Sequence, residues 1–291
     1  MSGIATSGVT SLDDSVTLRR GAKMPLFGLG TWLSENGDQC KDACLCALRQ
    51  GYKLIDTAQL YENESSVGQA IAEFVEERGR DALPFVVTKL WSKHHDDPEK
   101  ALRESLQKLQ MDAVDLFLIH TPSGANVVQV WTKLLEMRDA GLTKSVGVSN
   151  FGVEQLREME NAGLELPEVN QIELHPWLQQ EETVSYCREK NIQIMGYCPL
   201  ARLKMMGKSG LAQEAERIGI SEAQLAIRWS LEKGYVTIPK STNPKRITEN
   251  GSVPSLAALD GSAWDALNQA DCGFKASSSV NAMNLPWKEV S

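Results

Sequence analysis

Residues 85–120 read FVVTKLWSKHHDDPEKALRESLQKLQMDAVDLFLIH, and this stretch contains one complete repeating unit of the fold. Its apolar runs Phe85–Lys89 and Leu116–His120 are short and strand-like, and each predicts a buried strand. Between them an Asp-Pro pair at 97–98 suits the N-cap and first position of a helix, which we predict over Pro98–Gln110. Strands joined by a helix pair in parallel through a right-handed crossover.

The same alternation of strand and helix extends in both directions along the chain. The other expected strands are Leu26–Gly30, Leu54–Asp56, Ser145–Ser149, Val169–Ile172, Ile192–Tyr197 and Val236–Pro239. The other expected helices are Asp38–Arg49, Ser65–Glu77, Val127–Ala140, Val153–Asn161, Glu181–Lys190, a longer unit ending in Ser221–Glu232, and then Pro244–Asn250 and Ser262–Ala270. Eight such strands predict an α/β fold, a (β/α)8 TIM barrel, as a single domain over residues 1–291.

Two further segments flank the predicted barrel. Ser15–Phe27 alternates in polarity and turns at Arg20-Gly21, which predicts an N-terminal β-hairpin. Residues 272–291 have no clear periodicity and are expected to form an irregular C-terminal tail.

A doubly wound dinucleotide-binding fold is the competing arrangement of strand and helix units. It would be expected to place the glycine pattern G-x-G-x-x-G after its first strand. Here Gly28 and Gly30 are followed by Thr31, Trp32 and Leu33, without the third glycine. The barrel is therefore the favoured fold.

Composition limits the partners of the protein. The net charge is -8 over 291 residues, which argues against binding nucleic acid or an anionic membrane surface. No apolar run approaches the ~20 residues of a membrane helix, and residues 1–14 do not resemble a signal peptide. The 6 cysteines show no CxxC pair, so we expect reduced thiols and a cytoplasmic location. The pair His94-His95 fits a loop before the Asp97 cap better than a metal cluster, so we expect no metal.

Polar residues stand at the end of every predicted strand from the second onward. In a barrel of this type these carboxyl ends form the active-site face. The residues are Asp56, Lys89, His120, Ser149-Asn150, Asn170-Gln171, Tyr197 and Lys240-Ser241, and Tyr61 follows Asp56 by five positions.

The combination of Asp56, Lys89 and Tyr61 predicts acid-base chemistry. Buried charges must be paired, so Asp56 and Lys89 could form a plain supporting ion pair. A lysine beside Tyr61 would instead lower the pKa of the phenol. A tyrosine acid working near neutral pH would need a decrease of ~3 pKa units, equivalent to about 4 kcal/mol.

Six motifs, which occur in order along the chain, resemble the aldo-keto reductase superfamily. They are GYKLIDTAQLYENE at 51–64, VTKLW at 87–91, LFLIH at 116–120, GVSNF at 147–151, NQIELHP at 170–176 and IPKSTNPKRITEN at 238–250. The resemblance, which includes aldose reductase and prostaglandin F synthase, implies the barrel and NADPH-dependent reduction of aldehydes and ketones.

The resemblance also assigns roles to individual residues. Tyr61 would donate a proton to the carbonyl oxygen while the nicotinamide supplies hydride to the carbon. Lys89 would lower the pKa of Tyr61, Asp56 would hold Lys89, and His120 would orient the substrate oxygen. No metal is needed, because the cofactor carries the hydride.

The same comparison predicts which residues bind NADPH or NADP+. Ser149, Asn150 and Gln171 would hold the carboxamide, and Tyr197 would stack on the nicotinamide. Lys240, Ser241 and Arg246 would surround the 2′-phosphate, as two cations beside a helix start should. The remaining expected contacts are Thr31, Trp32, Asp56, Cys198, Leu200, Thr242, Glu249 and Asn250.

The substrate pocket is expected to be open and permissive. Trp32, Trp91 and Thr121 should line it beside Tyr61 and His120. The less favoured alternative for Trp32 and Trp91 is simple packing at the barrel rim. Cys198 replaces a frequent family serine, which weakens one expected phosphate contact, and Arg202 could compensate by reaching the pyrophosphate.

Three kinds of function remain open for this sequence. The leading one is a carbonyl reductase that acts on a small-molecule carbonyl substrate as a monomer. A cofactor-binding sensor or regulatory barrel with little turnover is the alternative, and a structural protein on the same scaffold is a third. The complete set Asp56, Tyr61, Lys89 and His120 favours the enzyme, because a structural role would not require it.

Overall fold

A computed structural model describes residues 8–123, 127–279 and 283 of the chain. Its main sheet contains eight parallel strands, which are hydrogen-bonded in sequence order from β3 to β10. They are β3 (Leu29–Gly30), β4 (Leu54–Asp56), β5 (Phe85–Leu90), β6 (Val114–Ile119), β7 (Thr143–Ser149), β8 (Val169–Glu173), β9 (Gln193–Tyr197) and β10 (Val236–Thr237). All eight lie within two or three residues of the predicted positions, which confirms the strand predictions.

The sheet closes into a barrel where the first and last strands meet. Around β3, the backbone N–H of Gly28 donates to the carbonyl of Thr237 across 3.0 Å, and Thr237 donates to Leu26 across 2.9 Å. A further parallel bridge joins Gly30 to Lys240. The predicted (β/α)8 barrel is confirmed. An open, doubly wound sheet would leave its first and last strands unpaired, whereas the segments of β3 and β10 are hydrogen-bonded to each other here, so that alternative is excluded.

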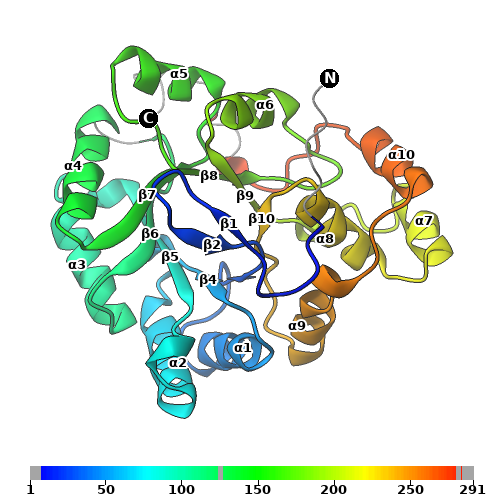
Figure 1. The fold of residues 1–291 in the computed structure, drawn as a ribbon, viewed down its shortest axis with the longest axis horizontal. Coiled ribbons are helices and arrows are strands. Elements are labelled where there is room, and N and C mark those ends of the chain that lie inside the picture. Colours follow the sequence, from blue (N-terminus) through cyan, green and yellow to red (C-terminus); the bar gives the residue numbers. More distant parts are fainter. Residues whose placement is uncertain (1–7, 124–126, 280–282, 284–291) are drawn as a thin grey trace.

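Helices surround this barrel as a ring (Figure 1). They are α1 (Asp38–Arg49), α2 (Glu64–Arg78), α3 (Pro98–Leu109), α4 (Val127–Asp139), α5 (Val153–Asn161), α6 (Glu181–Glu189), α7 (Leu211–Arg217), α8 (Glu222–Glu232), α9 (Pro244–Gly251) and α10 (Gly261–Gln269). Short 3₁₀ turns are η1 (Gln59–Tyr61), η2 (Arg80–Ala82), η3 (Ser92–His94), η4 (Ala201–Leu203) and η5 (Val253–Ser255). The predicted start of α3 is confirmed, because the Asp97 side chain accepts from the backbone N–H of Lys100.

The long unit predicted before residue 232 consists of two helices, α7 and α8. Gly219 has a φ of +76°, a left-handed conformation that ends α7. Ser221 then caps α8, and the Gln224 side chain completes a capping box.

The predicted N-terminal hairpin is confirmed and covers the amino-terminal end of the barrel. β1 (Ser15–Thr17) pairs antiparallel with β2 (Lys23–Pro25). The backbone N–H of Arg20 donates to Glu168, which precedes β8, so the hairpin lies at the end where the parallel strands begin. Figure 1 shows the hairpin crossing the middle of the ring of helices. The opposite, carboxyl-terminal end is left for the site.

Large aromatic side chains and close helix contacts make the interior of the protein dense. Trp131, Trp177 and Trp229 are fully buried. Gly68 lets α2 approach α3 so closely that a Cβ at this position would lie 2.4 Å from the carbonyl oxygen of Lys108. Within the described residues, no helix has the length and apolar character needed to cross a membrane.

The described part of the tail, residues 272–279, packs back against the barrel. The backbone N–H groups of Cys272 and Phe274 both donate to the carbonyl of Trp177. This part has no long helix, as predicted. The rest of the predicted tail, apart from residue 283, lies outside the described residues.

Candidate active site

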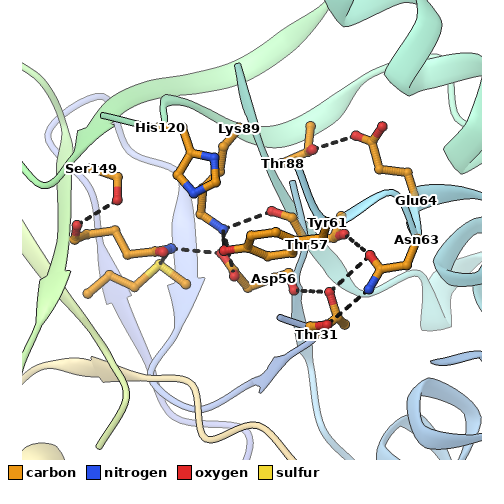
Figure 2. A network of polar contacts seen from close by, with 12 residues as sticks. Thr31, Asp56, Thr57, Tyr61, Asn63, Glu64, Thr88, Lys89, His120 and Ser149 are labelled. Atoms are coloured by element: carbon orange, nitrogen blue, oxygen red, sulfur yellow. Dashed lines mark hydrogen bonds and ion pairs between the residues drawn. The ribbon is translucent and has the colours of Figure 1, made fainter. Parts of the chain in front are cut away.

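The carboxyl ends of three neighbouring strands bring the predicted catalytic residues together. Asp56 ends β4, Lys89 lies near the end of β5, and His120 follows β6. The 3₁₀ turn η1, two residues after β4, carries Tyr61 back over these side chains, as Figure 2 shows. The four residues predicted to act together therefore meet in one place.

Lys89 forms the centre of this group. Its Nζ donates to Asp56 Oδ1 at 2.8 Å, to the Thr57 carbonyl at 2.9 Å and to the Tyr61 hydroxyl at 3.0 Å. The side chain of Lys89 is fully buried. The Asp56–Lys89 ion pair is thus more than a supporting contact, because the same ammonium also reaches the phenol.

The pKa of Tyr61 differs from the sequence-based expectation. The side chain is half-buried and its hydroxyl lies deep in the site, so burial raises the phenol pKa well above its usual value, and the charge of Asp56 raises it further. The predicted decrease in pKa is wrong for this structure, because loss of solvation and the nearby carboxylate outweigh the lysine contact. Tyr61 therefore carries its proton at neutral pH.

His120 is held in its neutral form. Burial, with a smaller contribution from the Lys89 charge, lowers the pKa of its imidazole to about 3. The ring lies edge-on to Tyr61, with the ring centroids 5.6 Å apart. Within the described part of the chain, its buried Nδ1 has no hydrogen-bond partner.

A second set of polar residues adjoins these four residues. Gln171 donates to Asp56 Oδ2 at 2.7 Å, and Ser149 donates to the Gln171 carbonyl at 2.8 Å. Asn150 donates to the His120 carbonyl at 3.0 Å and accepts from the Tyr197 hydroxyl at 2.7 Å. The residues predicted to hold the nicotinamide end are therefore linked by hydrogen bonds to those predicted to perform the chemistry.

A cavity of about 410 Å³ opens directly above these residues. The Trp32 ring packs against Tyr61 with centroids 4.8 Å apart and forms part of the wall. The cavity is lined by Gly30, Trp32, Asp56, Leu60, Tyr61, His120, Ser149, Asn150, Gln171, Tyr197, Cys198, Arg202, Ile238, Lys240 and Ser277–Ser279.

A second cavity of about 610 Å³ continues from the first. Trp32, Cys198, Arg202 and Lys240 line both, so the two form one elongated cleft. The outer cavity also contains Leu33, Pro199, Leu200, Leu203, Ser221, Ala223, Gln224, Pro239, Ser241, Thr242, Asn243, Arg246, Glu249 and Asn250.

The amino terminus of α9 lies at this outer cavity, where Asn243 and Arg246 form part of the lining. Asn243 caps the helix by accepting from the backbone N–H of Arg246 at 3.2 Å, and Pro244 occupies the first turn. Together with the Lys240 and Arg246 side chains, this terminus forms a site suited to an anion.

Three predicted contacts are not among the residues that line the two cavities. Thr31 is buried, and its hydroxyl donates to the Asp56 carbonyl at 2.9 Å, so it supports the site from behind. The backbone N–H of Trp91 donates to Gln59, and the Thr121 hydroxyl pairs with Ser123. The structure therefore brings none of Thr31, Trp91 and Thr121 into the described cleft.

Sequence reasoning missed two features of the site. Asn63 ties the loops together by accepting from the Thr57 hydroxyl and donating to the carbonyls of Thr31 and Ser34. The Asn-Glu pair at 63–64 belongs to the motif at 51–64, and it was the sequence signal that could have indicated this role of Asn63. The second feature is Ser277–Ser279, and a run of serines in an irregular tail gives no signal of where it folds.

Comparisons with known proteins agree with this geometry. The sequence model of the Aldo/keto reductase family matches residues 27–271. The chain is 38% identical to the glyoxal reductase of Bacillus subtilis (strain 168) over 264 residues, which is 89% of this chain and 95% of that protein. It is 40% identical to the methylglyoxal reductase DkgA of Escherichia coli (strain K12) over 245 residues, 82% of this chain and 86% of that protein.

A solved structure is similar as well. The crystal structure of Gox0644 in its apo form matches with a TM-score of 0.83 and 34% sequence identity, and the match covers 91% of this chain and 97% of that one.

Proposed function

The chain belongs to the aldo/keto reductase family, and from this premise we propose that it reduces aldehydes and ketones to alcohols with NADPH, using Tyr61 as the proton donor. One observation carries the proposal. A protonated Tyr61 phenol lies 3.0 Å from the Lys89 ammonium and edge-on to a neutral His120, at the floor of a cleft.

The cleft fits a dinucleotide phosphate. Its outer cavity has Lys240, Arg246 and the amino terminus of α9, which suit a doubly charged phosphate ester. Glu249 and Asn250 lie in the same cavity and would contact the base. Asn150, Gln171 and Tyr197 would hold the carboxamide and ring at the inner end, above Asp56 and Lys89. When bound there, NADPH supplies a hydride to the carbonyl carbon.

The protein supplies the proton at Tyr61. Because burial raises the pKa of this phenol, the proton is present when the carbonyl oxygen arrives. As the oxygen takes that proton, negative charge develops on the Tyr61 oxygen, where the Lys89 ammonium stabilises it. Asp56 and the Thr57 carbonyl keep the ammonium in place. Lys89 would thus stabilise the negatively charged Tyr61 oxygen that remains after the proton has been transferred.

Neutral His120 provides orientation. An uncharged imidazole can donate one hydrogen bond to the carbonyl oxygen without competing to protonate it. Its position beside Tyr61 directs that oxygen toward the phenol. The Asn150 contact to the His120 carbonyl fixes the backbone that carries the ring.

Small-molecule carbonyl compounds are the proposed substrates, and we propose that a monomer acts on them in the cytoplasm. The cleft opens on the same barrel face as every polar strand end described above, so one subunit contains the complete proposed site.

The experiment that tests the proposal follows NADPH consumption by its near-ultraviolet absorbance, with a panel of aldehydes, ketones and quinones. Tyr61→Phe keeps the ring that packs on Trp32 and removes only the donor. We expect it to lose roughly 10²- to 10⁴-fold in kcat while still binding NADPH. Tyr186→Phe is the matched control, because Tyr186 bonds Glu160 on the outer helices, and it should remain active.

Two results would contradict the proposal. If Tyr61→Phe is as active as the wild type, another group donates the proton. If the wild type binds NADPH but reduces nothing on the panel, a sensor or regulatory barrel explains the cleft better.

A further inference from the structure

Glu173, the last residue of β8, has a carboxylate that the proposed chemistry does not use. It is fully buried. Its Oε1 accepts from the backbone N–H of Ala276 at 2.6 Å and lies 3.0 Å from His175 Nε2. Its Oε2 accepts from the backbone N–H of Ser277 at 2.8 Å. One side chain of the barrel therefore binds two successive amides of the C-terminal tail.

Other contacts guide the tail to this carboxylate. The backbone N–H of Phe274 donates to the Trp177 carbonyl at 3.0 Å, and the Phe274 ring lies 6.3 Å from the His175 ring. Those contacts hold the chain only as far as residue 274. Beyond that point, Glu173 accepts the amides of both Ala276, which is buried, and Ser277. Without the carboxylate, the buried Ala276 amide would lose the acceptor that it has in this structure.

The seated tail reaches the active site. Ser277, Ser278 and Ser279 form part of the wall of the inner cavity. Tyr197 lines the same cavity, and its hydroxyl donates to Asn150. Asn150 donates to the carbonyl of His120. The tail that Glu173 binds therefore shares a cavity wall with Tyr197, which is linked through Asn150 to the residue that orients the substrate oxygen.

We propose that Glu173 is a positioning residue for the reaction: it seats residues 276–279 as the outer wall of the catalytic cavity and thereby sets the affinity for carbonyl substrates that extend to this wall. The inference rests on the reductase function proposed above. A small carbonyl compound such as methylglyoxal would be held at Tyr61 and His120 alone. A longer or aromatic aldehyde would extend to the serine wall.

The test compares Glu173→Gln with the wild type. The change keeps the size of the side chain but replaces one acceptor oxygen by an NH₂ group, which faces an amide donor of the tail. We expect the amides of Ala276 and Ser277 to exchange hydrogen about tenfold faster or more. We also expect KM for 4-nitrobenzaldehyde to rise about tenfold, with KM for methylglyoxal and both kcat values changed by less than about twofold.

The same strand offers a matched control. Glu168 is a buried carboxylate just before β8, and it accepts a backbone N–H of the N-terminal hairpin at the opposite end of the barrel. Glu168→Gln should leave tail exchange and both KM values unchanged. Ser277→Pro removes an amide donor from the tail side without altering the barrel, and it should reproduce the Glu173→Gln result even if that variant folds poorly.

The outcomes separate this proposal from the function on which it rests. Unchanged exchange at Ala276 in both variants, and at Ser277 in Glu173→Gln, would overturn the seating by Glu173. Faster exchange with both KM values unchanged, or with both raised equally, would overturn the positioning role. If the wild type reduces neither aldehyde, the reductase function fails, while hydrogen exchange still decides whether Glu173 seats the tail.

Discussion

The ammonium of Lys89 lies 3.0 Å from the hydroxyl oxygen of Tyr61, and its other two hydrogen-bond partners are Asp56 and the Thr57 carbonyl. An ammonium has three donors, so all three are engaged and the one aimed at Tyr61 cannot rotate away. This relationship fixes where charge can develop during proton transfer, and the first prediction follows from it.

Lys89→Met removes the cation and keeps the apolar stem. We expect kcat for carbonyl reduction to fall by roughly 10²- to 10³-fold, because the charge that develops on the Tyr61 oxygen loses its stabilising partner. The variant also leaves the buried Asp56 unpaired, which should reduce the free energy of unfolding by about 3–5 kcal/mol. Steady-state kinetics and denaturant unfolding measure the two effects.

The double variant Asp56→Asn/Lys89→Met separates stability from catalysis. Neutralising both partners should recover most of the lost free energy of unfolding without recovering kcat. Recovery of both together would mean that Lys89 matters only for the integrity of the fold.

His120 makes the protein sensitive to acid. Its pKa falls from 6.5 in the unfolded chain to about 3 in the fold, so the unfolded state binds the additional proton between those values. Stability from this group is fully present above pH 6.5 and decreases as pH falls toward 3. At pH 5 the loss is about 2 kcal/mol.

The variant His120→Gln checks this sign. It cannot titrate, so the decrease in free energy of unfolding between pH 7 and pH 5 should be smaller than in the wild type, as urea denaturation at each pH would show. Equal decreases in the two proteins would assign the acid sensitivity to other groups.

The outer cavity should determine the choice between NADPH and NADH. Lys240→Met/Arg246→Ala should raise KM for NADPH by roughly tenfold to a hundredfold, because charge-assisted bonds to the phosphate are lost. KM for NADH should change little. Lys245→Ala, on the same turn of α9 but outside the cavity lining, is the control and should affect neither cofactor.

Close packing between α2 and α3 predicts a stability effect far from the site. Gly68→Ala would place a Cβ 2.4 Å from the Lys108 carbonyl, and the helices would have to move apart. We expect a loss of about 1–3 kcal/mol in the free energy of unfolding. Gly261→Ala, where nothing lies within 4 Å of the new Cβ, should be close to neutral in the same measurement.

The barrel and the meeting of the four proposed catalytic residues were predictable from sequence because both depend on local patterns. Apolar runs marked each strand, and the residue after each run identified the face that carries the site. The predicted contacts of Tyr61, Lys89 and Asp56 are all present. Their spacing along the chain is set by strand length, which the sequence shows directly.

Properties that depend on three-dimensional surroundings were not predictable. The pKa of Tyr61 rises because burial and Asp56 oppose Lys89, and a sequence does not show which effect is larger. The position of Trp91 depends on a bond between its backbone and Gln59. The place of Ser277 at the cavity depends on Glu173, 104 residues away, at a strand end that the prediction put one residue too early.

The seam between β3 and β10 has a consequence for how the chain is made. During synthesis, the first strand leaves the ribosome about 210 residues before its partner, a long separation that slows the last step of folding. Lys240 lies at that seam and lines both cavities of the cleft. A growing or prematurely terminated chain therefore has no complete cleft for a dinucleotide, and the ability to bind one marks a chain whose barrel has closed.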